Sequence, residues 1–339
     1  MGNNPLHIII ESHIPFIKGL LEPYATVTYL PQDDITPEAV RDADAIFVRT
    51  RNRCDARLLE GSRVQFVATA TIGTDHIDLP WCASHGITVA NAAGCNAPAV
   101  AQYVLSSVLH LANRPLEQYT IGIVGVGHVG SIVERWARGL QMNVMLCDPP
   151  RQKAEGGSGW SSLSDIARRA DIITFHTPLT PDTRHMIDAG FLNALQRHPI
   201  IINSARGPVA DTPALIEALR SGTVHHAITD CWEGEPEISR QLLALSAIAT
   251  THIAGYSIEG KKRATCMVLD AFCRHFGLPE ITIAGGMPAP APGTVSASSL
   301  IASFDPEPLT AQLISHPEDF ETIRNTYPLR HEPRAGKID

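Results

Sequence analysis

The chain has 339 residues, of which 44% are hydrophobic and 18% are charged, and its formal net charge is −8 at pH 7. This length is enough for two or three domains, and this composition excludes a disordered chain. The acidic balance disfavours broad nucleic-acid binding, and no apolar run is long enough to span a membrane. Seven cysteines without a CxxC pair predict reduced thiols in a cytoplasmic protein. The HExxH pattern is also missing, so we expect no metal site.

Short apolar runs alternate with segments that can form helices over the first ninety residues. The runs are Leu6–Ile10 and residues 25–30, 45–50, 64–70 and 87–91. This alternation predicts parallel strands joined by crossover helices. A long helix is expected next, with Asn96 as its N-cap and Pro98 in its first turn.

The alternation begins again at Thr120–Val124. Further strands are predicted at residues 143–148, 171–177, 200–205, 227–230 and 247–252. A set of this size fits a doubly wound sheet. A helix is predicted at about Ile258–Phe276, followed by a Pro- and Gly-rich linker at residues 287–293. The sequence therefore predicts an α/β chain with two doubly wound, Rossmann-like parallel sheets and a short C-terminal extension.

A glycine motif lies between the strand at Thr120–Val124 and the helical pattern that follows it. Gly125, Gly127 and Gly130 form GxGxxG, in which the glycines allow a tight turn, a close approach of phosphate and close helix packing. Asp148 ends the next strand, at about the 20-residue spacing typical of a ribose-binding carboxylate. Such a carboxylate repels a 2′-phosphate, so the pattern favours NAD over NADP. The expected cofactor contacts of this region are Gly125, Gly127, His128, Val129, Gly130 and Asp148.

Three polar residues follow three different predicted strands. Arg206 follows residues 200–205, Glu235 follows residues 227–230, and His252 comes after AIAT (residues 247–250), near the end of its predicted strand. The carboxyl ends of parallel strands meet at one edge of a sheet, so these side chains can converge. The oxidation of a 2-hydroxy acid needs two functions that these residues can supply. An Arg can bind the carboxylate of the acid, and a His paired with a Glu can accept the proton of its hydroxyl. Taken singly, each also fits a structural role: a surface charge, a solvated loop residue or a core histidine.

Several stretches together resemble a known family. GIVGVGHVG, CDPPR, ADIITFHTPLT, INSARGPVAD, DCWEGEPE and HIAGYSIEGK are similar, in this order and spacing, to the D-isomer-specific 2-hydroxyacid dehydrogenases. The similarity covers about residues 5–285. FVATATIGTDHID and NAAGCNA are similar to one branch of that family, which acts on a phosphorylated 2-hydroxy acid. The resemblance implies an NAD-dependent oxidoreductase that works as a homodimer.

The resemblance also implies a domain organisation and residue roles. A nucleotide domain at residues 97–256 would be inserted into a substrate domain at residues 1–96 and 257–284, and residues 285–339 would be a shortened dimerisation region. Arg206, Glu235 and His252 match the catalytic residues, with His252 as the acid–base. The implied nucleotide contacts include Thr177, Asp230 and Gly255, with Asp230 holding the nicotinamide amide, and the implied substrate contacts are Thr50, Thr71 and Tyr256.

Two alternatives to this function remain open at this point. The substrate could be another 2-hydroxy acid, such as glycerate or 3-phosphoglycerate, or the chain could be a non-catalytic NAD-sensing protein. The presence of all three candidate catalytic residues argues against a sensor. Near the C-terminus, Arg324 and Arg330 are candidates for contact with a substrate phosphate, although the sequence favours plain surface charges for them.

Overall fold

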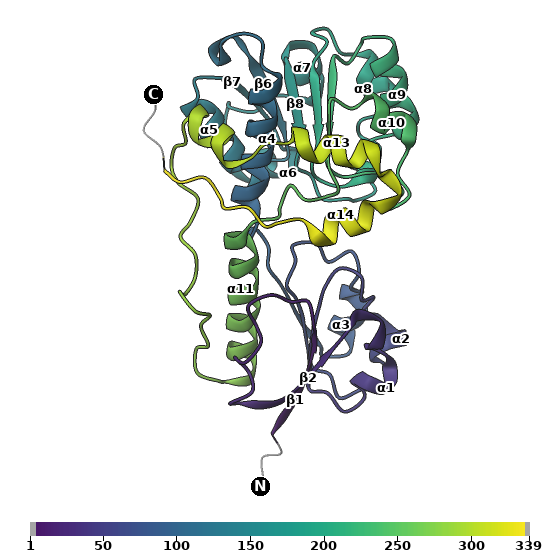
Figure 1. The fold of residues 1–339 in the computed structure, drawn as a ribbon, viewed down its shortest axis with the longest axis vertical. Coiled ribbons are helices and arrows are strands. Elements are labelled where there is room, and N and C mark those ends of the chain that lie inside the picture. Colours follow the sequence, from purple (N-terminus) through teal and green to yellow (C-terminus); the bar gives the residue numbers. More distant parts are fainter. Residues whose placement is uncertain (1–4, 336–339) are drawn as a thin grey trace. The chain divides into compact units, whose positions relative to one another are not determined.

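The structure is a computed structural model that describes residues 5–335, and it contains two compact units (Figure 1). Among the described residues, the first unit comprises residues 5–96 together with Ile258–Pro290, and the second comprises Ala97–Ser257 with residues 291–335. Residues 1–4 and 336–339, at the ends of the predicted domain ranges, lie outside the described residues. No helix within residues 5–335 is long and apolar enough to cross a membrane.

The first unit is built on a parallel sheet of five strands in the order β2-β1-β3-β4-β5. β-branched and aromatic residues fill these strands, and both faces of the sheet are covered. Ile8 and Phe47 face α11, whereas Ile9 and Ile46 belong to the cluster that contains the short helices α1 to α3. The strands are β1 (Leu6–Glu11), β2 (Ala25–Leu30), β3 (Ala45–Val48), β4 (Phe66–Thr69) and β5 (Thr88–Asn91). The helices are α1 (Pro37–Val40), α2 (Ala56–Leu59), α3 (Leu79–Ser84) and α11 (Ile258–Phe276).

The second unit is built on a parallel sheet of six strands in the order β11-β10-β9-β8-β6-β7. The order reverses beside β6, which is the switch point where ligands bind in doubly wound sheets. The strands are β6 (Thr120–Val124), β7 (Asn143–Cys147), β8 (Ile172–Phe175), β9 (Ile200–Asn203), β10 (His226–Thr229) and β11 (Ile248–Ala249). The helices are α4 (Ala97–Leu111), α5 (His128–Gly139), α6 (Pro149–Glu155), α7 (Leu163–Arg169), α8 (Ala189–Asn193), α9 (Thr212–Arg220), α10 (Arg240–Leu245), α12 (Ala297–Ser303), α13 (Glu307–Ser315) and α14 (Phe320–Thr326).

The predicted fold class is confirmed, because both sheets are parallel and carry helices on their two faces. One detail of the prediction is wrong. The long helix begins at Ala97, next to Asn96, but the buried Oδ1 of Asn96 accepts no hydrogen bond from the described residues. This residue precedes the helix without capping it through that oxygen.

The residues after the predicted linker pack into the second unit. Val295, Leu300 and Phe304 join the core cluster on the face of α4, and Phe320 and Ile323 of α14 join the cluster on the opposite face of the sheet. The linker itself is anchored there, because Trp136 Nε1 donates to the carbonyl of Pro292 at 2.8 Å. In Figure 1 these C-terminal helices are yellow-green to yellow. The C-terminal region therefore completes the core of this unit.

Candidate active site

The glycine loop between β6 and α5 has the geometry that a dinucleotide pyrophosphate needs. Gly125 has a φ of +87°, and a Cβ there would lie 2.8 Å from the backbone of His176. A Cβ at Gly130 would lie 2.1 Å from the carbonyl oxygen of Gly125, so the helix can approach the strand only with glycine there. Gly127 has open space around it and precedes α5 without a side-chain cap. The first N–H groups of α5, at His128 and Val129, therefore lie at an open helix N-terminus beside this loop.

Asp148 stands beside this loop, at the end of β7. Its Oδ2 accepts from the N–H of Val126 at 2.8 Å, and its Oδ1 accepts from the N–H of Arg151 at 3.0 Å. The carboxylate thus caps α6 and is fixed against the glycine loop, while each oxygen retains a lone pair for a ribose hydroxyl. These features fit an NAD site: a loop with room for phosphates, followed by a fixed carboxylate.

We expect the Asp148→Asn variant to lose at least about 10-fold of its preference for NAD over NADP, because the charge that repels the 2′-phosphate is removed. Asparagine is also a good N-cap, so the substitution isolates charge from helix capping. The measurement is kcat/KM with each nucleotide. Asp188→Asn is the matched control, since Asp188 caps α8 with a 2.7 Å bond to Phe191 N–H. An unchanged preference in Asp148→Asn would refute this role for Asp148.

Thr177 and Gly255 lie in the same unit as the glycine loop. The backbone nitrogen of Thr177 would be 3.1 Å from a Cβ on Gly125, which places Thr177 against the loop. The neighbouring His176 is partly buried, and desolvation lowers its pKa to about 3, so it is neutral near pH 7. Gly255 is partly exposed in the turn that follows His252.

Asp230 is a buried carboxylate at the end of β10, with an exposed fraction of 1%. Its Oδ1 accepts from Thr250 Oγ1 at 2.6 Å and from Ile253 N–H at 2.8 Å, and its Oδ2 accepts from Ala254 N–H at 3.0 Å. The side chain therefore fixes the turn that directly follows His252. A buried charge needs such partners, and one lone pair of Oδ2 is left for another donor.

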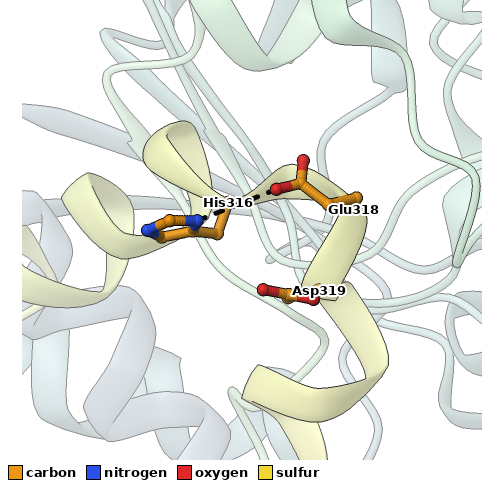
Figure 2. Close-up of side chains that lie close together, drawn as sticks. All are labelled: His316, Glu318 and Asp319. Atoms are coloured by element: carbon orange, nitrogen blue, oxygen red, sulfur yellow. Dashed lines mark ion pairs between the residues drawn. The ribbon is translucent and has the colours of Figure 1, made fainter.

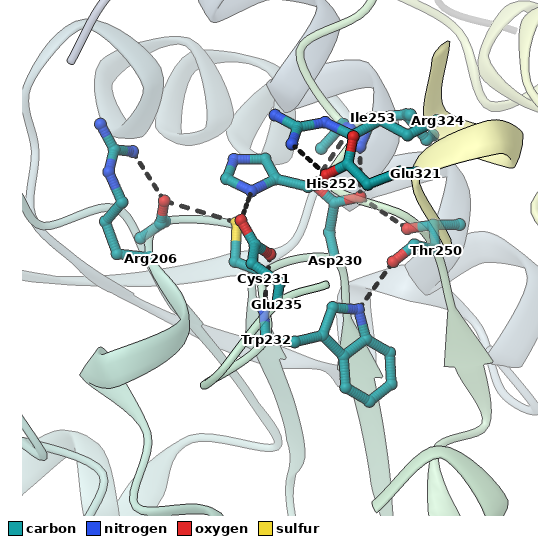
Figure 3. Close-up of polar contacts among 12 residues, drawn as sticks. Arg206, Asp230, Cys231, Trp232, Glu235, Thr250, His252, Ile253, Glu321 and Arg324 are labelled. Carbon is teal, nitrogen blue, oxygen red and sulfur yellow. Dashed lines mark hydrogen bonds and ion pairs between the residues drawn. The ribbon is translucent and has the colours of Figure 1, made fainter. Parts of the chain in front are cut away.

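His252 and Glu235 form a pair at the carboxyl end of the sheet (Figure 3). The distance from His252 Nδ1 to Glu235 Oε1 is 2.5 Å, and Oε2 of the same glutamate accepts from Trp232 N–H at 3.2 Å. The backbone of His252 has a φ of +59°, an unfavourable conformation for histidine that costs about 1–3 kcal/mol. Asp230 holds this conformation, because its carbonyl accepts from His252 N–H at 2.9 Å and its carboxylate binds the next two N–H groups. With Nδ1 facing Glu235, Nε2 is the nitrogen that can exchange a proton with a ligand.

Arg206 lies on the same edge of the sheet, after β9. Its Nη1 donates to the carbonyl of Ala205 at 2.8 Å, and that carbonyl also accepts from the Cys231 thiol at 3.4 Å. The next residue must be glycine, because a Cβ at Gly207 would lie 1.9 Å from the carbonyl oxygen of Trp232. The structure thus brings Arg206, Glu235 and His252 to the ends of successive strands β9, β10 and β11 (Figure 3). Cys231 is buried, and burial raises its pKa well above the ordinary value, so a nucleophilic thiolate is disfavoured.

The expected substrate contacts are divided between the two units. Tyr256, in the second unit, has a ring that makes an edge contact with Tyr327, with centroids 6.3 Å apart. Thr50 and Thr71 belong to the first unit. Thr50 is exposed just after β3, whereas Thr71 Oγ1 lies 2.7 Å from Thr69 Oγ1.

Sequence reasoning missed two sets of contacts that support this site. Tyr103 on α4 bonds to Thr250 Oγ1 at 2.8 Å, and Thr250 in turn bonds to Asp230. Arg330 donates to the carbonyls of Ile253, Ala254 and Tyr256, at 3.2, 2.6 and 3.0 Å. No local pattern reveals such bonds, because their partners are far apart in sequence.

One further group of metal-ligand residue types occurs within residues 5–335, at His316, Glu318 and Asp319 just before α14 (Figure 2). His316 Nδ1 lies 3.7 Å from Glu318 Oε1. All three side chains are exposed, and exposed acidic groups of this kind are common without an ion. Nothing else in the surroundings points to a metal there.

Comparison with known proteins gives a consistent result. The family model for the D-isomer specific 2-hydroxyacid dehydrogenase, NAD binding domain, matches residues 99–254. The chain is 47% identical to erythronate-4-phosphate dehydrogenase of Bacteroides thetaiotaomicron, over 98% of this chain and 99% of that one. It is 41% identical to erythronate-4-phosphate dehydrogenase of Porphyromonas gingivalis, over 98% of this chain and 95% of that one.

Solved structures share the fold. The apo form of Rhodotorula graminis D-mandelate dehydrogenase has a TM-score of 0.69 at 26% identity, covering 86% of this chain and 100% of that one. Aquifex aeolicus D-lactate dehydrogenase, complexed with NAD and lactic acid, has a TM-score of 0.68 at 24% identity, covering 80% of this chain and 96% of that one.

Proposed function

We propose, since the chain belongs to the erythronate-4-phosphate dehydrogenase group of the D-isomer-specific 2-hydroxyacid dehydrogenases, that it oxidises 4-phospho-D-erythronate with NAD. The product would be (R)-3-hydroxy-2-oxo-4-phosphooxybutanoate, for pyridoxal 5′-phosphate (vitamin B6) biosynthesis. The observation that carries the proposal is the His252–Glu235 pair, 2.5 Å apart, on the same sheet edge as Arg206. A proton acceptor and an anion-binding guanidinium are what this oxidation requires of the protein.

The proposed roles follow from the geometry of each side chain. Glu235 accepts from Nδ1 of His252, which fixes the ring and stabilises its positive charge. His252 Nε2 takes the proton of the C2 hydroxyl, while Arg206 binds the carboxylate and the developing carbonyl oxygen. Bound NAD supplies the acceptor for the hydride that leaves C2. Proton and hydride together account for the two hydrogens lost when the alcohol becomes a ketone.

The proposed binding residues are those of the glycine loop and of the strand ends. NAD would be held by Gly125, Gly127, His128, Val129, Gly130, Asp148, Thr177, Asp230 and Gly255. The substrate would contact Thr50, Thr71 and Tyr256. For Asp230, the remaining lone pair of Oδ2 supports a contact with the nicotinamide amide, in addition to its bonds to the turn after His252.

The Glu235 carboxylate of the His252–Glu235 pair has a lowered pKa. Burial acts to raise the pKa of Glu235, but the hydrogen bond and charge of His252 outweigh it and hold the pKa below the ordinary 4.5. The carboxylate is therefore ionised at neutral pH. The stability that this ionisation gives the fold is present above the ordinary carboxyl pKa and is lost as the pH falls through the lower pKa of the folded state.

Oxidation should accelerate as the pH rises and the imidazole loses its proton. In Glu235→Gln we expect kcat to fall about 100-fold across the pH range, because the imidazolium that forms during oxidation loses its counter-charge. The measurement is kcat against pH. Glu233→Gln is the matched control, since Glu233 lies in the same loop and forms a 2.7 Å pair with a different histidine, His185. A kcat of Glu235→Gln close to the wild-type value throughout the pH range would count against the pair.

A substrate panel tests the proposed function itself. Purified protein would be assayed with NAD and 4-phosphoerythronate, 3-phosphoglycerate, glycerate or D-lactate, with a 2-oxo acid acceptor present to draw the reaction forward. We expect a clear preference for 4-phosphoerythronate. A preference for another acid would keep the chemistry and change the substrate, and tight NAD binding without any turnover would instead indicate a sensor.

We also propose that the chain is a cytoplasmic homodimer. The support is the resemblance to the family and two exposed apolar side chains on the C-terminal helices, Ile301 on α12 (47% exposed) and Ile314 on α13 (50% exposed). Sedimentation of the wild type and of an Ile301→Glu, Ile314→Glu double variant would test the dimer. A wild type that sediments as a monomer would refute it.

A further inference from the structure

Arg324 is an arginine of the second unit whose guanidinium interacts with Glu235 and Asp230 of the candidate active site. It lies on α14, whose Phe320 and Ile323 are buried in the core of the second unit. The Arg324 side chain is 17% exposed, its Nη1 forms a long ion pair with Glu321 Oε1 at 3.5 Å, and the guanidinium also hydrogen-bonds the Tyr256 side chain. Its Nε is buried and has no hydrogen-bond acceptor among the described residues. A buried donor without a partner is costly, so this side chain retains capacity for an anion that is not part of the chain.

The neighbours of Arg324 place it at the site. Burial acts to lower the pKa of the guanidinium, but Tyr256, Glu235 and Asp230 raise it above its ordinary value. In the view of Figure 3, the His252 ring lies between the Arg206 guanidinium and that of Arg324. Burial raises the pKa of the Cys231 thiol, while the charges of Arg206 and Arg324 act to lower it, so both arginines lie near this buried residue. Two cations therefore accompany one acid–base residue.

Arg330 differs from Arg324, although the sequence offered both as phosphate ligands. Every nitrogen of its guanidinium already donates to the protein. Nε donates to Gln102 at 2.9 Å, and Nη2 donates to the carbonyls of Ala99 and Ala254 at 3.0 and 2.6 Å. Nη1 donates to Tyr327 and to the carbonyls of Ile253 and Tyr256. The structure corrects the hypothesis for Arg330: this residue holds the turn after His252 and has no donor left for a phosphate.

We propose that Arg324 binds the phosphate of the substrate and selects phosphorylated over unphosphorylated 2-hydroxy acids. This inference rests on the proposed function, in which the substrate carries a carboxylate next to the reacting carbon and a phosphate at its other end. Arg206 binds the carboxylate end, and Arg324, which interacts with the charges of Glu235 and Asp230, supplies a second guanidinium for the phosphate end. A guanidinium offers several coplanar N–H donors to phosphate oxygens. The Nε–H of Arg324, which has no acceptor among the described residues, is one of these donors.

The test compares two substrates that differ only in the phosphate, 4-phosphoerythronate and D-erythronate. For Arg324→Gln we expect kcat/KM with 4-phosphoerythronate to fall about 100-fold, mainly through KM, because a charged hydrogen bond is lost. The fall in kcat/KM with D-erythronate should be about 10-fold or less. The preference for the phosphorylated substrate therefore drops at least about 10-fold. Arg324→Lys, which keeps the charge without the fork, should fall between wild type and Arg324→Gln. Arg220→Gln, on the exposed end of α9, is the control.

A structural role for Arg324, such as holding Tyr256, would lower kcat/KM equally for both substrates and would overturn the inference. Failure of the proposed function is visible separately, because the wild type would then not prefer 4-phosphoerythronate. In that case, calorimetric titration of the NAD-bound protein with inorganic phosphate still tests Arg324. Binding that is present in wild type and Arg220→Gln but lost in Arg324→Gln supports the inference, and equal binding by all three proteins overturns it. NAD affinity and thermal unfolding, measured for each variant, show whether the fold is intact.

Discussion

Replacing His252 by Asn is expected to lower kcat for 4-phosphoerythronate about 1000-fold, because the group that takes the hydroxyl proton is removed. Asparagine is chosen because it tolerates the left-handed backbone conformation of this residue, with a φ of +59°. The turn held by Asp230 should therefore survive the substitution. The measurements are steady-state kcat and the dissociation constant of NAD, of which only the first should change strongly.

A matched control exists for the unusual backbone of His252. His198 is an exposed histidine that also has a positive φ, +45°, and its Nδ1 lies 2.7 Å from the carbonyl oxygen of Gly222. His198→Asn should turn over like the wild type. If His252→Asn retained more than about a tenth of the wild-type kcat, another group would be the proton acceptor.

Replacing Arg206 by Lys is the second large effect that we expect, with kcat/KM falling about 100- to 1000-fold. Lysine keeps the positive charge but cannot offer two parallel donors to a carboxylate and the adjacent oxygen. Both KM and kcat should suffer, because this side chain contacts the ground state and the developing carbonyl oxygen alike. The measurement is the separate determination of kcat and KM for Arg206→Lys and Arg206→Gln.

The position of Arg206 allows this result to be separated from misfolding. Arg206 is partly exposed, and the close approach to Trp232 is made by the next residue, Gly207. Thermal unfolding of Arg206→Lys should therefore match the wild type. Arg220→Lys, on the exposed end of α9, should keep full activity. A small loss in Arg206→Lys together with a large one in Arg206→Gln would mean that charge alone is needed, which contradicts the bidentate role.

The sequence was sufficient to predict the fold class and the gathering of the polar residues. Both rest on short-range patterns: apolar runs fixed the strands, and residues at the ends of parallel strands share one edge of the sheet. Arg206, Glu235 and His252 follow β9, β10 and β11, so topology alone brings them near one another. The glycine motif was equally readable, because backbone conformation at Gly125 and steric contact at Gly130 admit no other residue.

The supporting contacts could not be predicted, because they join segments distant in sequence. Arg330 bonds to Gln102, 228 positions away, and nothing in either local sequence indicates the other. The same limit explains why Arg324 and Arg330 looked alike: both are basic residues near the C-terminus. Their different roles depend on which acceptors the packed C-terminal segment brings within reach. The packing of α12 to α14 into the second unit likewise depends on how side chains fit together, and the hydrophobic pattern of the sequence does not indicate it.

We expect this chain to transfer a hydride from C2 of a phosphorylated 2-hydroxy acid to bound NAD, while the adjoining hydroxyl loses its proton to a residue of the protein. The most direct measurement uses 4-phosphoerythronate carrying deuterium at C2, followed by mass spectrometry of the nucleotide and of the acid. The result we predict is one deuterium in the reduced nicotinamide and a 2-oxo acid without it, at a rate that falls about 1000-fold in His252→Asn. Reduced nucleotide without deuterium, or no reduction of NAD at all, would contradict the claim.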